Sequence, residues 1–376
     1  MENKAFLAKG DTSRVSDKLI TGRKTLMKTN DLLSEVQKGI GWITLNRPAA
    51  LNALSLAMIR GLALLLKKWE ADSSVNVILI QGAGEKAFCA GGDVRAVYEA
   101  KRVGDLETCD AFFREEYTLN NYIHAYPKPY IALMDGIAMG GGLGVSVNGS
   151  HRIVTERALL AMPETGIGFF PDVGATTFLN MAPGSVGLYL GLTGTRIKAE
   201  DALWAGLATH YLPFAQLASF KEDLQQGNAF EDALSAFCEA PPEKGFLEHH
   251  AELIEAHFNK PTLKEIMESL AEDPSPFSQN TYNTLMSKSP TSLAVVFRQL
   301  KEGKTLSFPD RMKLEFRLSQ HFVKGHDFME GVRAVLIDKD HLPRWMPQKL
   351  ENLRDQDIDI YFSSLGEREL ILEGVT

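Results

Sequence analysis

The segment from Gly136 to Gly174 constrains the fold of this chain more than any other stretch. It contains a run of three glycines, Gly140 to Gly142, then small apolar residues, and then two carboxylates, Glu164 and Asp172, each directly after a proline. Glycine has no Cβ atom, so its backbone can approach a ligand closely. The first N–H groups of a helix after such a turn lack partners within the helix and carry partial positive charge. The segment therefore predicts a turn and a buried helix whose N–H groups can stabilise a negative oxygen.

A second glycine turn, at Gly91 and Gly92, follows an apolar run at 75–81, and the triple glycine follows another apolar run at 130–134. Both runs predict buried strands. If these strands are neighbours in one sheet, both turns lie at the same end, and two backbone N–H groups can converge on one oxygen. Such an oxyanion hole lowers a reaction barrier by roughly 3–4 kcal/mol per donor. The two turns and the two carboxylates together favour acyl chemistry in an apolar site.

Each of these features also has a simpler interpretation. A triple glycine before an apolar run can serve helix–strand packing alone. Asp172 can be the N-cap of a following helix, and Glu164 can lie in a solvated loop. Two other glycine motifs fit poorly, because the first turn lacks the Lys-Ser/Thr of a phosphate-binding loop and the second lacks the context of a dinucleotide-binding motif. The simpler interpretations stay open at the level of sequence.

Composition argues against several classes of protein. The formal net charge of −8 disfavours nucleic acid or an anionic membrane as the main partner. The three cysteines show no C-x-x-C or zinc spacing and the nine histidines no H-E-x-x-H, so we expect no metal site. No apolar run of about 18 residues occurs, and residues 1–26 lack the apolar core of a secretory signal. The odd cysteine count fits a reducing compartment. We therefore expect a cytoplasmic protein, or one of the mitochondrial matrix in a eukaryote, although no clear transit peptide is evident.

Three regions are expected along the chain. Residues 1–28 are polar and mixed in charge and predict a disordered extension. Residues 29–214 alternate between strand and helix signals, which predicts an α/β layer structure with crossover helices. Strand signals fade from about residue 215, so residues 215–376 are predicted to be consecutive helices that cover the active site.

Five segments, in chain order, resemble motifs of the enoyl-CoA hydratase/isomerase (crotonase) superfamily. They are LNRPAALNALS, AFCAGGD, KPYIALMDGIAMGGGLGVSV, AMPETGIGFFPDVGA and GLTGTRIKAEDALWAGLATH. The resemblance covers about residues 35–212. It implies a crotonase-like spiral of repeated β-β-α units, followed here by the helical C-terminal region. It also implies that the N–H groups of Gly92 and Gly141 form an oxyanion hole for the carbonyl of a coenzyme A thioester.

One departure from the superfamily pattern bears on the reaction. Hydratases and dienoyl-CoA isomerases carry a carboxylate three residues after the second oxyanion glycine, where this chain has Gly144. Segments such as FFREEYTLNNYI and the helical C-terminus to about residue 364 resemble a branch that hydrolyses 3-hydroxyisobutyryl-CoA in valine catabolism. The resemblance implies a thioesterase that binds a small acyl-CoA and uses no metal or redox cofactor.

Glu164 and Asp172 are the predicted catalytic residues. In an apolar pocket desolvation would raise the pKa of Glu164, which would act either as a base on water or as a nucleophile that forms an anhydride. Asp172 would hydrogen-bond the 3-hydroxyl of the substrate or position the water. Glu116 matches a substrate-binding position of the family, although a solvated helix face is an alternative on local grounds. With Gly141, these three carboxylates are the predicted substrate-binding residues.

Two other functions stay open. One is an enoyl-CoA hydratase or isomerase of the same fold, which Gly144 disfavours. The other is a non-catalytic acyl-CoA-binding protein, which the presence of both Glu164 and Asp172 disfavours. The sequence does not distinguish among small 3-hydroxyacyl groups. A homo-oligomer is common in the superfamily, but the long C-terminal region can cover the surface involved.

Overall fold

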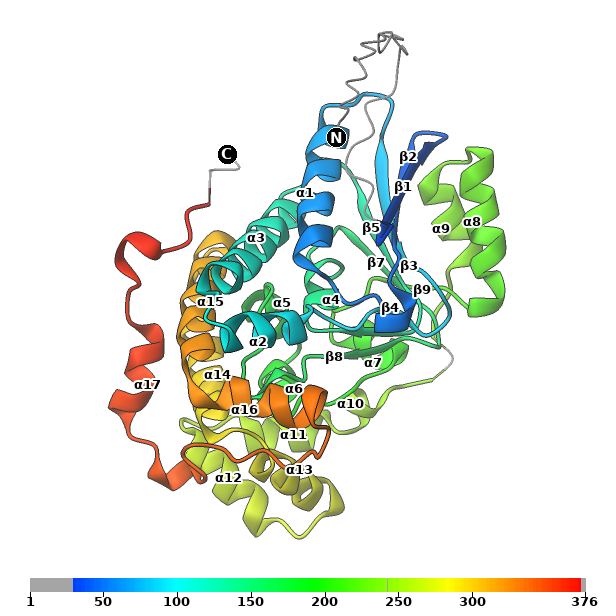
Figure 1. The fold of residues 1–376 in the computed structure, drawn as a ribbon. Coiled ribbons are helices and arrows are strands. Elements are labelled where there is room, and N and C mark those ends of the chain that lie inside the picture. The colour runs from blue at the N-terminus through cyan, green and yellow to red at the C-terminus, as the bar shows by residue number, and fades with distance from the viewer. Residues whose placement is uncertain (1–29, 242, 373–376) are drawn as a thin grey trace, which may run out of the picture.

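The computed structural model describes residues 30–241 and 243–372, so the extension predicted at 1–28 lies outside the described residues. Two sheets form its framework (Figure 1). The larger has six strands in the order β1-β2-β3-β5-β7-β9, and the smaller has three in the order β4-β6-β8. The strand bounds are Leu32–Gln37 (β1), Ile40–Leu45 (β2), Val77–Gly82 (β3), Ala87–Cys89 (β4), Tyr130–Met134 (β5), Ile137–Met139 (β6), His151–Val154 (β7), Leu159–Ala161 (β8) and His210–Tyr211 (β9).

Three consecutive repeats each contribute one strand to each sheet. β3, β5 and β7 are parallel neighbours in the larger sheet, and the strands that directly follow them, β4, β6 and β8, are parallel neighbours in the smaller one. This arrangement confirms the predicted spiral of β-β-α units and the predicted pairing of the strands near 75–81 and 130–134. The strands β4 and β6 were not predicted, because three residues are too few to show a hydrophobic period.

Helices cover both faces of the larger sheet. Successive residues of a strand point to opposite faces, and accordingly Ile78 and Ile80 belong to one hydrophobic cluster and Leu79 to another. α8 and α9 pack against the face of Leu79, whereas α1 and α3 lie on the opposite side (Figure 1). The helices of this half are Leu56–Glu70 (α1), Val94–Arg102 (α2), Leu106–His124 (α3), Gly141–Gly144 (α4), Ala175–Met181 (α5), Val186–Thr193 (α6), Ala199–Trp204 (α7), Leu217–Gln226 (α8) and Phe230–Phe237 (α9).

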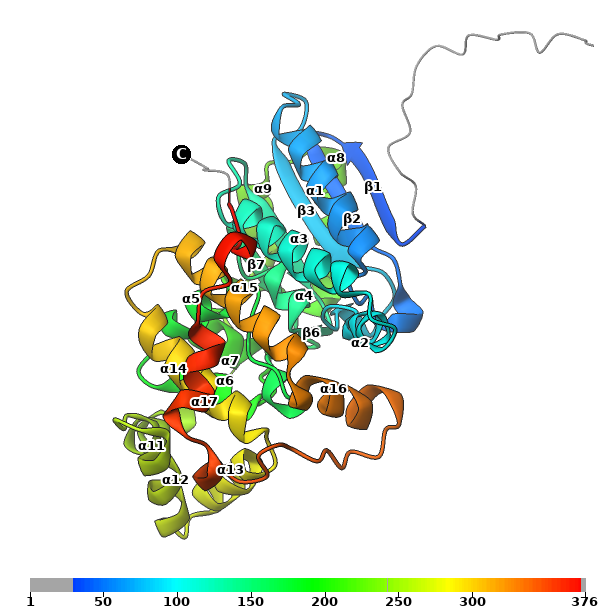
Figure 2. The same cartoon turned by 60° about the vertical axis from the view of Figure 1, so that its left-hand side comes forward.

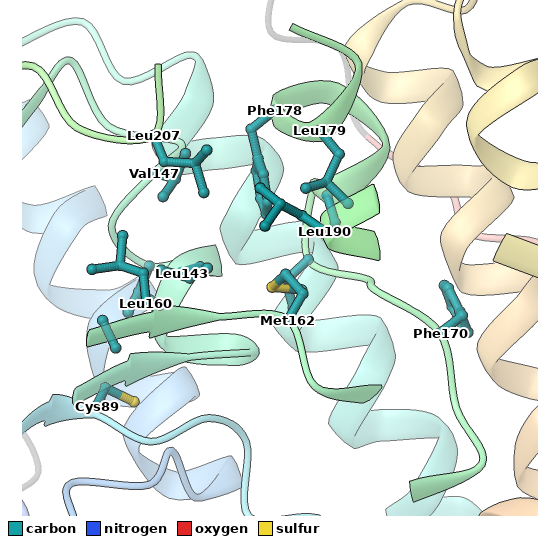
Figure 3. Packing of buried hydrophobic residues seen from close by; sticks show 14 of the residues in the cluster. Cys89, Leu143, Val147, Leu160, Met162, Phe170, Phe178, Leu179, Leu190 and Leu207 are labelled. Carbon is teal, nitrogen blue, oxygen red and sulfur yellow. The ribbon is translucent and has the colours of Figure 1, made fainter. Parts of the chain in front are cut away.

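After β9 the described residues form mainly consecutive helices. One hydrophobic cluster extends from Ile43 to Leu370 and joins both halves, and Figure 3 shows part of it around Leu143, Leu160 and Leu190. α15 lies alongside α3 in both ribbon views (Figures 1 and 2). No helix of the described residues is long and apolar enough to cross a membrane. The remaining helices are Phe246–His249 (α10), Ala251–Phe258 (α11), Leu263–Glu272 (α12), Pro276–Met286 (α13), Pro290–Gly303 (α14), Phe308–Lys324 (α15), His326–Val332 (α16) and Asp355–Phe362 (α17).

The helix after the triple glycine is much shorter than predicted. α4 spans only Gly141–Gly144, and residues 145–148 continue as turns. Glycine is a poor helix former because it loses the most backbone freedom. Nδ2 of Asn148 also donates to the carbonyl oxygens of Gly144, at 2.8 Å, and Val173, at 2.9 Å, which ties the end of the short helix to the loop that carries Asp172.

Candidate active site

The carboxyl ends of the three short strands bring together the main predicted site residues. β4 leads to Gly92, β6 leads to Gly141, and β8 leads to Glu164. The three strands are parallel neighbours in the order β4-β6-β8. Their ends therefore lie at one edge of the smaller sheet, although almost fifty residues separate the two glycine turns in the sequence.

The N–H groups of Gly92 and Gly141 are neighbouring donors. Neither makes a hydrogen bond within the described part of the chain. A Cβ atom placed on Gly141 would lie 2.9 Å from N of Gly92 and 2.6 Å from Oε1 of Glu116. Only glycine leaves this space open. The arrangement fits the predicted oxyanion hole.

The turn at Gly91 and Gly92 is held by the segment that follows β2. The carbonyl of Gly91, whose φ is +121°, accepts from N of Leu54 at 2.8 Å, and N of Asp93 donates to the carbonyl of Leu54 at 2.9 Å. The guanidinium of Arg47 donates to Oδ2 of Asp93 through two nitrogens, both at 3.0 Å. These contacts on both sides of Gly92 fix the direction of its N–H group.

The three predicted carboxylates are all buried. Glu116 is 2% exposed, and Glu164 and Asp172 are each 6% exposed. The solvated-loop interpretation of Glu164 and the solvated-face interpretation of Glu116 are therefore wrong. The N-cap interpretation of Asp172 is also wrong, because α5 has Gly174 as its N-cap and no side chain caps it.

Burial in an apolar interior controls the ionisation of this cluster. Desolvation raises the pKa of Glu164 well above its ordinary value, and the negative charges of Asp172 and Glu116 add to the effect. The pKa of Glu116 is also raised well above its ordinary value, first by burial and then by the charge of Asp172. Burial raises the pKa of Asp172 to about 7, against the lowering effect of a hydrogen bond from Tyr117. Oε1 of Glu116 and Oε2 of Glu164 have no hydrogen-bond partner among the described residues.

Two further residues fix the loop of Asp172, and sequence reasoning missed both. The hydroxyl of Tyr117, on α3, donates to Oδ2 of Asp172 at 2.6 Å. Glu315, on α15, is fully buried and accepts from the backbone N–H groups of Gly174, at 2.7 Å, and Thr176, at 2.9 Å. The only available signal for Tyr117 was its position next to Glu116. Glu315 lies about 140 residues from its partners, and no local pattern marks it.

The space beside Gly144 is filled. A Cβ atom placed there would lie 2.6 Å from Cβ of Val173 and 2.9 Å from Nδ2 of Asn120. Real Cβ atoms essentially never approach other heavy atoms this closely. A carboxylate side chain at this position, as in the hydratases that the motifs resemble, would require Val173 to move.

Comparison with protein families supports the resemblance seen in the motifs. The sequence model of the family described as "Enoyl-CoA hydratase/isomerase" matches residues 40–362. The chain belongs to this family. The match includes the smaller sheet, the larger sheet from β2 onward, and α14 and α15, so the family extends across both halves of the shared core.

Several proteins with sequences similar to this chain carry one name. A protein of Danio rerio named "3-hydroxyisobutyryl-CoA hydrolase, mitochondrial" is 47% identical over 352 residues, which cover 91% of this chain and 92% of that protein. Proteins with the same name from Xenopus laevis and Homo sapiens are 49% and 45% identical. They cover 88% and 90% of this chain, and the same shares of their own lengths.

Two solved structures share the fold over almost the whole chain. One, from Mycobacterium thermoresistibile, is described as a carnitinyl-CoA dehydratase; it has a TM-score of 0.88 and 37% identity, and the match covers 92% of this chain and all of that chain. The other, from Rhodobacter sphaeroides, is described as an enoyl-CoA hydratase; it has a TM-score of 0.85 and 37% identity, and the match covers 91% of this chain and 99% of that chain. The helical C-terminal region is thus part of the fold that this chain shares with both structures.

Proposed function

We propose that this chain is a thioesterase that cleaves 3-hydroxyisobutyryl-CoA to 3-hydroxyisobutyrate and CoA, and that it acts in valine catabolism. The single observation that carries the proposal is the identity of 45–49%, over about nine-tenths of the chain, to proteins named 3-hydroxyisobutyryl-CoA hydrolase. The geometry of the site is consistent with it. Two unpaired N–H groups, at Gly92 and Gly141, lie beside buried carboxylates in an apolar interior of the described chain.

Each residue of the site has its own role in the proposed reaction. The N–H groups of Gly92 and Gly141 stabilise the negative charge that develops on the thioester oxygen. Glu164, once ionised, takes a proton from water, whose oxygen attacks the carbonyl carbon; the carbon–sulfur bond breaks and the thiolate receives the proton. In the alternative route, Glu164 attacks the carbonyl carbon itself and releases the thiolate, and water then hydrolyses the anhydride. Both routes need an unpaired carboxylate oxygen, which Oε2 of Glu164 supplies within the described part of the chain.

A second candidate is hydration of a short enoyl-CoA, which the likeness to the Rhodobacter sphaeroides enoyl-CoA hydratase favours. Gly144 argues against it. Val173 and Asn120 occupy the space in which a carboxylate at position 144 would have to lie. A mechanism that needs a carboxylate at position 144 as well as Glu164 would therefore lack the first of the two.

The setting of the enzyme is part of the same proposal. The relatives named above carry the word "mitochondrial", which supports a mitochondrial location in a eukaryotic cell. We propose the matrix there, and the cytoplasm in a bacterial cell. The substrate is a small acyl-CoA, and the route described uses no metal or redox cofactor. Whether the chain forms a homo-oligomer stays a prediction.

A thiol-release assay over a panel of acyl-CoA esters tests the function. The purified chain should release free CoA from 3-hydroxyisobutyryl-CoA faster than from crotonyl-CoA or acetyl-CoA. Loss of the enoyl absorbance of crotonyl-CoA is followed in parallel, because hydration consumes the double bond without freeing a thiol. Rapid hydration without thiol release would replace the thioesterase by the hydratase. Tight acyl-CoA binding with neither reaction would identify a non-catalytic member of the family.

A further inference from the structure

Asn120 is a buried amide without a hydrogen-bond partner among the described residues. The side chain lies on α3 and is 0% exposed. Within residues 30–241 and 243–372, neither Oδ1 nor Nδ2 of Asn120 has a hydrogen-bond partner. Buried polar groups in native proteins are nearly always paired, and an unpaired amide destabilises the fold. Asn120 is therefore a group that a bound molecule can satisfy.

The position of Asn120 places it in the same site as the predicted oxyanion hole. It follows Glu116 by one helical turn, so both side chains lie on one side of α3. They face two glycines that are also one turn apart on α4. Oε1 of Glu116 lies 2.6 Å from the Cβ position of Gly141, and Nδ2 of Asn120 lies 2.9 Å from the Cβ position of Gly144. Asn120 thus lies beside the part of α4 that is one turn beyond the predicted position of the thioester carbonyl.

The chemistry of the amide suits a hydroxyl group. A hydroxyl both donates and accepts hydrogen bonds, and an amide offers a donor at Nδ2 and an acceptor at Oδ1. A carboxylate, once ionised, can only accept hydrogen bonds. An amide also adds no negative charge to a site where carboxylates already raise one another's pKa values. A neutral donor beside an acceptor is what recognition of an alcohol requires.

The loop of Asp172 supplies that acceptor. Val173, the next residue, has a φ of +55° and contacts the same space beside Gly144 as Asn120 does. This left-handed conformation is uncommon for a β-branched residue. It places Val173 against α4 while Tyr117 holds the carboxylate of Asp172. Tyr117 precedes Asn120 by three residues on α3, so Asn120 and the hydroxyl that holds Asp172 lie on one side of that helix.

We propose that Nδ2 of Asn120 donates a hydrogen bond to the 3-hydroxyl group of the acyl chain, which in turn donates to the carboxylate of Asp172. Asn120 is then a specificity-determining residue that favours 3-hydroxyacyl-CoA esters over esters that lack the hydroxyl. This assignment rests on the proposed thioesterase function. It accounts for the amide of Asn120, which has no partner among the described residues.

The test compares two substrates on the wild-type enzyme and on Asn120→Leu, which keeps the branched shape and removes both polar atoms. The kcat/KM for 3-hydroxyisobutyryl-CoA, divided by that for isobutyryl-CoA, should fall by about tenfold or more, since one discriminating hydrogen bond is lost. The fall in the ratio should come from a lower kcat/KM for 3-hydroxyisobutyryl-CoA, and the kcat/KM for isobutyryl-CoA should change little. Asn120→Ala, which only removes atoms, is the second variant if the leucine does not fit.

Asn180→Leu is the matched control. Asn180 lies on α5 outside the proposed site, and the protein uses its amide donors, on the carbonyl oxygens of Thr176 and Leu300. Its replacement should lower stability and leave the ratio of the two substrates unchanged. Equal losses on both substrates for the Asn120 variants would overturn the assignment and indicate a packing role or a buried water. A wild-type enzyme that hydrolyses neither ester would instead contradict the proposed function on which the assignment rests.

Discussion

Glu164 combines three properties at the scale of a single residue: burial, an unpaired oxygen and a charged neighbourhood. Its carboxylate must be ionised to act as base or nucleophile, yet burial and the charges of Asp172 and Glu116 favour the protonated form. The pKa is raised, so the active form is lost as pH falls through a value well above the ordinary 4.5. We therefore expect kcat to rise with pH and to reach its plateau well above the pH at which an ordinary glutamate is ionised.

Glu164→Gln tests this residue directly. The amide keeps the shape but supplies neither a base nor a nucleophile, so kcat for 3-hydroxyisobutyryl-CoA should fall by at least about 10²–10⁴-fold. Removal of a buried, unpaired carboxylate should leave the thermal unfolding temperature unchanged or raise it. A folded variant that keeps the wild-type kcat and its pH profile would remove Glu164 from the chemistry.

At the scale of elements, the contact between α15 and the start of α5 decides how the Asp172 loop is held. Glu315 accepts two backbone N–H groups, one with each carboxylate oxygen. A glutamine has only one acceptor oxygen, so its NH₂ group would face one of the two donors. Glu315→Gln should cost about 1–3 kcal/mol of unfolding free energy and lower kcat, because Asp172 lies two residues before Gly174. Glu115→Gln is the control, since its ion pair with Arg60 is exposed and such pairs contribute roughly 0–1 kcal/mol.

The pH dependence of this effect has a defined sign. Burial raises the pKa of Glu315 from 4.5 to about 7 in the folded state. Between these values the folded chain binds the proton and the unfolded chain has released it, so the contribution of Glu315 to stability falls as pH rises. The stability difference between wild type and Glu315→Gln should therefore be larger in urea unfolding at about pH 5 than at about pH 8. A difference that grows with pH would contradict the raised pKa.

At the scale of the whole molecule, one core supports both halves of the chain. The cluster runs from Ile43 to Leu370, and Nε2 of Gln299, on α14, donates to the carbonyl of Pro171 at 2.8 Å. Truncation after residue 240 would remove α14 and α15 and expose the apolar faces of α3 and α5. We expect the fragment to lose cooperative thermal unfolding and all CoA release, measured by circular dichroism and the thiol assay. A cooperatively folding, fully active fragment would make the C-terminal region a separate module.

The sequence by itself determined much of this protein. The apolar runs at 75–81 and 130–134, the two glycine turns and the carboxylates of the second turn are local features, and local features determine strands, turns and the residue types available for chemistry. The order of these features along the chain was enough to indicate the family. They also selected Glu116, Glu164 and Asp172, because their spacing matches family motifs.

Only the tertiary structure decided which groups meet. The three-residue strands β4 and β6 have no period of their own, yet their pairing with β8 brings Gly92, Gly141 and Glu164 to one edge. Burial of Glu116 depends on contacts with distant elements, so its helix pattern alone left a solvated face open. The roles of Glu315 and Asn120 could likewise not be predicted from local sequence. A buried polar group acquires its role from partners that are distant in sequence, or from the lack of them, and pairing across such distances is a property of the packed core.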